Sequence, residues 1–74
     1  MSTRNDAVEQ AYREHWARLL ALLTAELRDL DLAEESLQDA FATAVSSWPP
    51  FPANPPAWLL TAARRRAVDR LRRT

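Results

Sequence analysis

The absence of glycine constrains the fold of this 74-residue chain more than any other feature. Tight β-hairpin turns need residues at positive φ, and glycine adopts that conformation most readily. Phosphate-binding loops of the glycine-rich kind need glycine as well. The sequence therefore disfavours strand architectures and loop-type nucleotide sites, and it predicts an all-α protein.

Length and composition exclude several functional classes. A chain of 74 residues forms one small domain, whose core supplies only roughly 3 to 5 kcal/mol, so an unaided enzyme pocket is not expected. The lack of cysteine excludes disulfides and thiolate metal sites. The sequence holds no apolar run long enough to cross a bilayer, and its polar N-terminus is unlike a secretory signal. We therefore expect a cytoplasmic protein that does not bind membranes.

The five prolines all lie between residues 49 and 56, and this proline-rich loop divides the chain. Apolar residues before it recur at spacings of three and four, after the possible capping residues Asp6 and Asp31. These signals predict helices at about 6–28 and 31–48, the second stopped by the prolines. After the loop, Asn54 can cap a third helix and Pro55 can take its first position, which predicts a helix at 55–73.

The apolar stripes of these three helices predict the core of a small helical domain. Three of the predicted core residues are aromatic, one on the first helix and two in the stripe of the second, and the rest are leucine and alanine. The predicted set is Tyr12, Leu19, Leu23, Leu37, Phe41, Ala44, Trp48, Leu60, Ala63 and Leu71.

Charge is divided unevenly along the chain, although the formal net charge is zero. Residues 1–47 contain nine acidic side chains and four arginines, whereas residues 48–74 contain six arginines and one acidic residue, Asp69. The six arginines follow directly after the proline-rich loop and its tryptophans. A concentrated basic and aromatic surface of this kind indicates nucleic-acid binding.

Two helix faces point away from the predicted core. Because an α-helix turns by about 100° per residue, the third helix groups four residues on its outer side, Trp58, Thr61, Arg65 and Arg72. The second helix groups Glu35, Gln38, Asp39, Ala42 and Ser46 opposite its stripe. The single histidine, His15, has no ligand partners at metal spacing, so we expect no metal, no cofactor and no catalytic residue.

Three segments of the sequence carry a resemblance: AEESLQDAF at 33–41, AWLLTAARRRAVDRLRR at 57–73 and, more loosely, residues 12–15. Together they resemble region two of the extracytoplasmic-function sigma factors of bacterial RNA polymerase. The segment AEESLQDAF at 33–41 resembles the core-binding helix of their region two. The segment AWLLTAARRRAVDRLRR at 57–73 is similar to their promoter-reading helix, and residues 12–15 match the opening helix more loosely. The sequence departs from many relatives in having arginine at position 65 and glutamate at position 35, and in its proline-rich loop.

The resemblance implies a three-helix domain of the region-two type that gives RNA polymerase its promoter specificity. The second helix would dock on the clamp helices of the largest polymerase subunit, through Glu35, Gln38, Asp39, Ala42 and Val45. The loop and third helix would recognise and melt the minus-ten element, holding the single-stranded non-template strand through Phe51, Asn54, Trp58, Thr61, Arg65 and Arg72. An anti-sigma factor stays open as a further partner.

The same resemblance implies a second domain that this chain does not contain. Sigma factors of this class continue into a helix-turn-helix domain, so we expect residues 1–74 to be a single region-two domain of an excised or truncated chain. One alternative from another class is a helical interaction module, which would use its acidic and basic faces to dimerise or to bind a regulatory protein without contacting DNA. Binding to the polymerase clamp helices discriminates between the two.

Overall fold

The computed structural model describes residues 3–47 and 53–73, and the side chains of 6–47 and 53–73. These residues form three α-helices and no strand: α1 is Thr3–Leu27, α2 is Leu30–Ser47 and α3 is Pro55–Arg73. The expected all-α fold is confirmed. The helix ends lie within three residues of those predicted.

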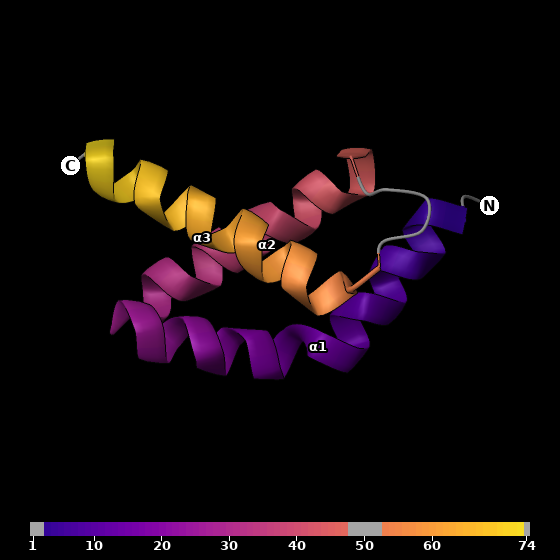
Figure 1. Cartoon of the computed structure of the whole chain (residues 1–74), viewed down its shortest axis with the longest axis horizontal. Helices are drawn as coiled ribbons and strands as arrows, with labels where there is room; N and C mark the ends of the chain where they lie inside the picture. The colour runs from indigo at the N-terminus through magenta and orange to yellow at the C-terminus, as the bar shows by residue number, and fades with distance from the viewer. Residues whose placement is uncertain (1–2, 48–52, 74) are drawn as a thin grey trace.

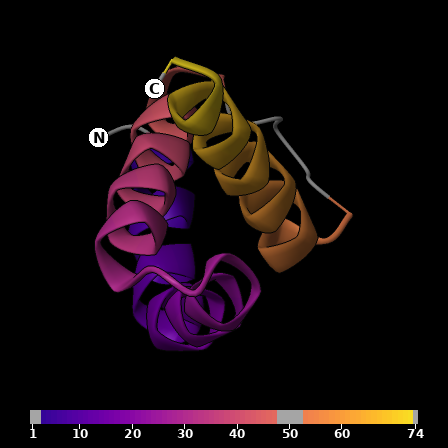
Figure 2. The ribbon, with the colours of Figure 1, turned by 90° about the vertical axis from the view of Figure 1, so that its left-hand side faces the viewer.

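The helices are arranged around α2, which packs against both of the others (Figure 1). In the view of Figure 2, α2 and α3 run side by side above α1. The buried residues of α2 and α3 are mainly alanines, among them Ala40, Ala44, Ala63 and Ala67. Such small side chains let the backbones of α2 and α3 approach closely. The opposite face of α3, with Thr61, Arg65 and Arg72, is exposed.

The core contains most of the residues expected there and omits two. Leu19, Leu23, Leu37, Phe41, Ala44 and Ala63 are buried, and Leu60 is partly buried against them. The prediction that Tyr12 and Leu71 belong to the core is wrong, since these side chains are 47% and 57% exposed. Tyr12 lies on the outside of an aromatic cluster, stacked on Trp16, and Leu71 lies in the last turn of α3. Trp48 lies outside the described residues.

Two of the three predicted caps, Asp6 and Asp31, are wrong. α1 already begins at Thr3, because neither proline nor glycine precedes Asp6 to stop it, and Asp6 falls in the first turn. The cap of α2 is Asp29 rather than Asp31, since its Oδ1 accepts the amide hydrogen of Leu32 at 3.0 Å. Asn54 caps α3 as expected, accepting the amide hydrogen of Ala57 at 3.1 Å.

The turn between α1 and α2 is built without glycine. Arg28 adopts the left-handed conformation there, with φ at 55°, and its amide donates to the carbonyl of Thr24 at 2.7 Å. A residue with a Cβ at this position costs roughly 1 to 2 kcal/mol. Glycine removes this strain and adds roughly 0.5 to 1 kcal/mol of chain entropy to the unfolded state.

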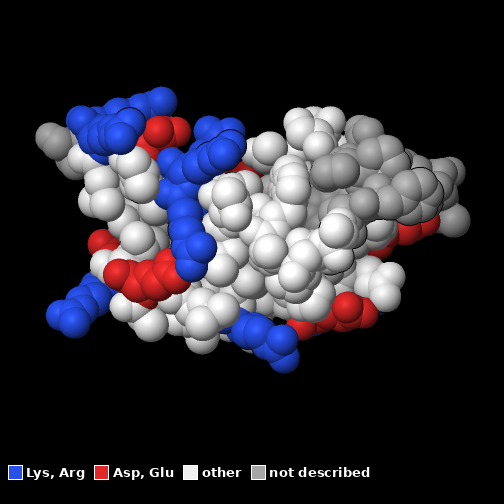
Figure 3. All heavy atoms as spheres, in the orientation of Figure 1, with Lys and Arg blue, Asp and Glu red and all other residues white. Residues whose placement is uncertain are grey.

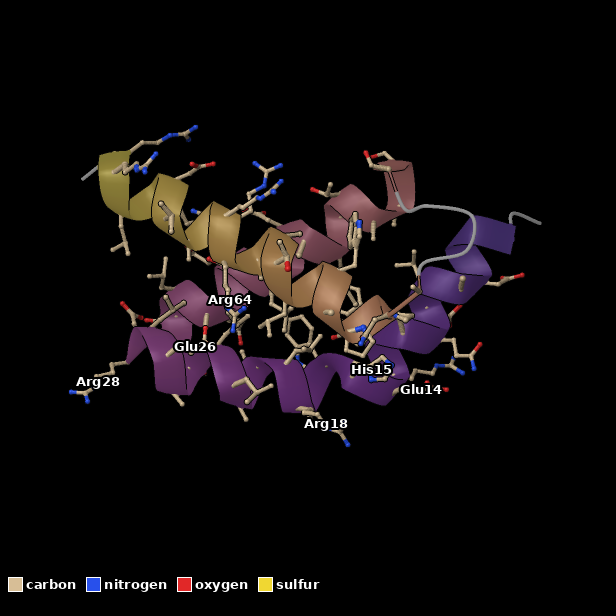
Figure 4. The ribbon with its side chains drawn as sticks, viewed as in Figure 1. Glu14, His15, Arg18, Glu26, Arg28 and Arg64 are labelled. Carbon is tan, nitrogen blue, oxygen red and sulfur yellow. The ribbon has the colours of Figure 1, made fainter. Side chains whose placement is uncertain are left out.

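We therefore expect Arg28→Gly to raise the free energy of unfolding by up to about 1 kcal/mol. Arg18→Gly is the matched control, because Arg18 is also an exposed arginine but sits within α1 (Figure 4). It should lower the free energy of unfolding by about 1 kcal/mol. Urea unfolding followed by circular dichroism measures both, and a loss of stability in Arg28→Gly would contradict the strain at this turn.

Candidate functional site

Two of the six arginines of α3 join this helix to its neighbours. Arg64 donates to Glu26 of α1 through Nε, at 3.0 Å from Oε2, and through Nη2 to Oε1 (Figure 4). Arg70 donates to Oδ2 of Asp39 at 2.7 Å and lies 3.2 Å from Oε2 of Glu35, both on α2. These contacts hold α3 against both other helices.

The ion pairs shift the pKa of three of the groups that form them. The hydrogen bond from Arg64 holds the pKa of Glu26 below its ordinary value, against a smaller opposing effect of desolvation. The pKa of Arg64 is raised by the same hydrogen bond, and that of Arg70 is raised chiefly by its bond to Asp39. All of these side chains stay partly exposed, so each pair aligns helices more than it stabilises them.

The Glu26 pair gives a pH dependence with a defined sign. A carboxyl group whose pKa is lower in the folded state stabilises the protein above the unfolded-state pKa, and that stabilisation is lost as the pH falls through the folded-state pKa. We expect Glu26→Gln to remove part of the stability loss seen on acidification below about pH 4.5. Thermal melts of the parent and Glu26→Gln between neutral and acidic pH measure this difference, and Glu9→Gln, at an exposed position of α1, is the control.

If the melting temperatures of the parent and Glu26→Gln fall in parallel as the pH is lowered, the pairing of Glu26 with Arg64 is contradicted.

The other four arginines of α3, namely Arg65, Arg66, Arg72 and Arg73, have no acidic partner in the described part of the chain. All four are exposed, and one makes only a long contact, 3.4 Å from Nη2 of Arg66 to Oγ1 of Thr43 on α2. Basic atoms gather over the C-terminal half of α3 in Figure 3. This half of the helix is therefore a part of the described surface where several positive charges gather and are available to a partner.

Two shallow hollows lie along this outer face of α3. The first is formed by Trp58, Thr61, Arg65 and Arg66 with Thr43 of α2, and the second continues past Thr61 and Arg65 to Arg72. Trp58 is partly buried against the core and still lines the first hollow. The structure thus brings together four of the six residues predicted to bind DNA, as an aromatic side chain followed by positive charges.

The remaining two predicted DNA-binding residues belong to the loop before α3. Asn54 is exposed, but its side-chain oxygen is occupied in the cap of α3. Phe51 lies outside the described residues. Within residues 53–73, the side chains available for a DNA interface therefore come mainly from α3 rather than from the loop before it.

The predicted docking residues on α2 divide into a polar and an apolar group. Glu35 and Asp39 both face Arg70, while Gln38 is exposed and its side chain forms no hydrogen bond within the described residues. Ala42 and Val45 are also exposed and line an apolar groove between α1 and α2, together with Val8, Tyr12 and Phe41. Two of these residues belong to the aromatic cluster, in which the ring of Tyr12 meets that of Phe41 edge-on at 5.3 Å.

Sequence reasoning missed Arg70 and Tyr12 as residues of this surface. Arg70 follows Ala63 and Ala67 on the buried side of α3, which places it at the edge of the α2 contact. That spacing was visible in the sequence, although the acidic partners of Arg70 were not.

In the described residues no three histidine, aspartate or glutamate side chains come together as a metal site requires. His15 lies beside one acidic residue, Glu14 (Figure 4).

Comparison with known proteins decides the family. A model described as "Sigma-70 region 2" matches residues 11–74. The chain belongs to this family. The resemblance drawn from residues 33–41 and 57–73 is thereby confirmed. No solved structure matches the chain significantly.

The similar curated proteins are mainly sigma factors. The chain is 40% identical over 70 residues to "ECF RNA polymerase sigma factor SigK" of Mycobacterium sp. strain KMS, an alignment that covers 90% of this chain and 36% of that protein. The sigma factor of the same name from Mycobacterium ulcerans strain Agy99 is 37% identical, with 90% and 37% covered. The chain is also 39% identical over 56 residues to "Uncharacterized protein R00370" of Rhizobium meliloti strain 1021. This alignment covers 73% of this chain and 13% of that protein. The chain thus spans little more than a third of the sigma factors that it matches.

Proposed function

We propose that this sigma-70 region 2 domain docks on core RNA polymerase and binds the non-template strand of the minus-ten promoter element during transcription initiation. The proposal assigns a binding role, without a catalytic residue. None of the described helices is long and apolar enough to pass through a membrane. The site of action would be the cytoplasm, where the polymerase transcribes.

One observation carries the DNA-binding part of the proposal, namely the division of the α3 arginines. Arg64 and Arg70 are engaged with carboxylates, whereas Arg65 and Arg72 are exposed without an acidic partner among the described residues. Arg65 lines the same hollow as Trp58 and Thr61, and Arg72 lines the next hollow along α3. Single-stranded nucleic acids bind to surfaces that combine aromatic side chains, which stack on bases, with cations along the phosphates. If the arginines were only a solvated helix end, an aromatic side chain on the same face would have no role there, yet Trp58 lines one hollow with Arg65.

The polymerase-binding part is supported by the composition of the α2 surface. Gln38, Ala42 and Val45 present exposed polar and apolar groups next to a groove, and the acidic pair Glu35 and Asp39 borders them. Interfaces between proteins commonly combine an apolar centre with a polar rim. We assign the clamp helices of the largest polymerase subunit as the partner of this surface, since that is what region-two domains bind.

The DNA proposal is tested by titrating labelled single-stranded oligonucleotides at several salt concentrations. Arg65→Ala and Arg72→Ala should each weaken binding to all strands and flatten the plot of log affinity against log salt by about 0.7, because each removes one phosphate contact. Arg18→Ala is the matched control, since it removes one exposed charge on α1, away from α3 (Figure 4). We expect it to leave the salt slope unchanged.

The outcome separates the competing functions. If both α3 variants bind like the parent, the four exposed arginines are only a solvated helix end, and the DNA assignment is wrong. If the domain binds neither oligonucleotides nor the clamp helices while remaining folded, a helical interaction module with a different partner is the better assignment.

A further inference from the structure

One carboxylate lies within the basic face of α3. Asp69 is exposed and lines both hollows, next to Arg65 and Arg66 in the first and next to Arg65 and Arg72 in the second. Helix geometry places it about 6 Å along the axis from Arg65 and about 4.5 Å from Arg72. It therefore occupies the centre of the surface that we assign to DNA.

Asp69 differs from the other carboxylates near the arginines of α3. Glu26, Glu35 and Asp39 are all in ion pairs with this helix. Asp69 has arginines at the four- and three-residue spacings that allow pairing within a helix, yet it forms no ion pair or hydrogen bond in the described part of the chain. Its two oxygens are thus accessible acceptors.

A carboxylate at this place would weaken a surface that bound only phosphates. An ionised aspartate repels phosphate oxygens and can only accept hydrogen bonds. Bases, in contrast, offer donors that differ among them. Cytosine, adenine and guanine carry an exocyclic amino group, and aspartate recognises this group on cytosine in duplex DNA. Thymine carries carbonyl oxygens in its place, and its one ring N–H lies between two of them, where they repel a carboxylate.

We propose that Asp69 is a specificity-determining residue that accepts a hydrogen bond from the exocyclic amino group of a base and disfavours thymine at that position. The inference rests on the proposed function, because it requires DNA on the outer face of α3. Arg65 and Arg72 on either side hold the flanking phosphates, so the strand is kept near the carboxylate despite its charge. Binding affinity comes from the arginines and selection from Asp69.

The test compares oligonucleotides of deoxycytidine with oligonucleotides of deoxythymidine of the same length at neutral pH, using the whole 74-residue chain. Both bases are pyrimidines, so the comparison isolates the amino group from differences in ring size. We expect the parent protein to prefer the cytosine strand by roughly tenfold, as for a hydrogen bond to a charged acceptor. In Asp69→Ala we expect stronger thymine binding and a preference close to one.

Asp69→Asn keeps the shape of the side chain and supplies an amide that donates to the carbonyls of thymine. We expect it to lose the preference for cytosine. Since Asp69 is exposed, neither variant should change the free energy of unfolding by more than about 0.5 kcal/mol, and thermal melts verify this.

Three results would overturn the inference. An equal gain for both strands in Asp69→Ala would show that the carboxylate only repels phosphate. A parent protein without preference, or a preference that persists in both variants, would show that Asp69 reads no base. In all of these cases Arg65→Ala and Arg72→Ala still weaken binding. If instead the parent shows no salt-dependent binding to any strand, the proposed function fails, and the inference fails with it.

Discussion

Leu59→Ala is expected to lower the free energy of unfolding by about 2 to 5 kcal/mol and to leave much of the domain unfolded at room temperature. Leu59 is fully buried, with none of its surface exposed, and it belongs to the cluster that joins α3 to the other helices. Removing its side-chain atoms loses their burial and leaves a cavity in a close-packed interior. A domain of this size has only a few kcal/mol in total, roughly 3 to 5.

Leu60→Ala is the matched control for this prediction. Leu60 is the same residue type one position along α3, but it is only partly buried at the edge of the core. It should lose clearly less stability than Leu59→Ala in urea unfolding followed by circular dichroism. Equal losses, or a larger loss for Leu60→Ala, would mean that α3 is rotated relative to the packing described here.

The choice between these two leucines also shows where the sequence stopped being informative. Trp58, Leu59 and Leu60 are three consecutive apolar residues, and a stripe through Leu60 and Ala63 is compatible with a helix period. The observed stripe runs through Leu59, Ala63 and Ala67 instead. Periodicity fixes a face only to within about one residue, because an apolar arc more than about 100° wide can face the core at several rotations. The neighbouring helices decide among them.

The helices themselves could be predicted because their signals are local. Asn54 and Pro55 begin α3 as expected, since a cap and a first-turn proline depend only on adjacent backbone. Arg28 could not be predicted to adopt positive φ, because the sequence offers no glycine to mark the turn. The start of α2 shifted with it, and Asp29 became the cap.

The candidate site shows the same division between local and long-range information. The shared face of Trp58, Thr61 and Arg65 follows from helix geometry alone, and the structure places these residues around one hollow. The pairs of Arg64 with Glu26 and of Arg70 with Asp39 join residues 38 and 31 positions apart, so they depend on how the helices pack. These pairs decide which arginines stay available, and no helix pattern reveals them.

The Arg70 contacts alter how the docking surface on α2 should be tested. The helix pattern places Asp39 opposite the apolar stripe of α2, where a reversal of its charge would be expected to leave folding nearly unchanged. In the structure Asp39 accepts a hydrogen bond from Arg70, and Asp39→Arg would bring two guanidinium groups together at the contact of α2 with α3. Weaker docking of that variant would mix a loss of binding with a loss of folding.

Gln38→Arg avoids this problem, and we expect it to weaken binding to the clamp-helix fragment of RNA polymerase by tenfold or more. Gln38 is exposed and its side chain forms no hydrogen bond within the described residues, so the substitution should change stability by less than about 0.5 kcal/mol. If α2 docks through this face, the new guanidinium is buried in the interface without a partner, which costs several kcal/mol at the centre of a contact.

Ala25→Arg provides the matched control, because it adds an arginine at an exposed position of α1 rather than of α2. Its affinity for the clamp-helix fragment should equal that of the parent, measured by a pull-down or by titration with a labelled fragment. Thermal melts of all three proteins separate binding from folding. Since the groove beside Ala42 and Val45 continues the same surface, Val45→Arg should weaken binding similarly. If Gln38→Arg and Val45→Arg both bind as tightly as the parent, α2 does not dock through this face, and Glu35 and Asp39 serve mainly to hold Arg70 of α3 in place.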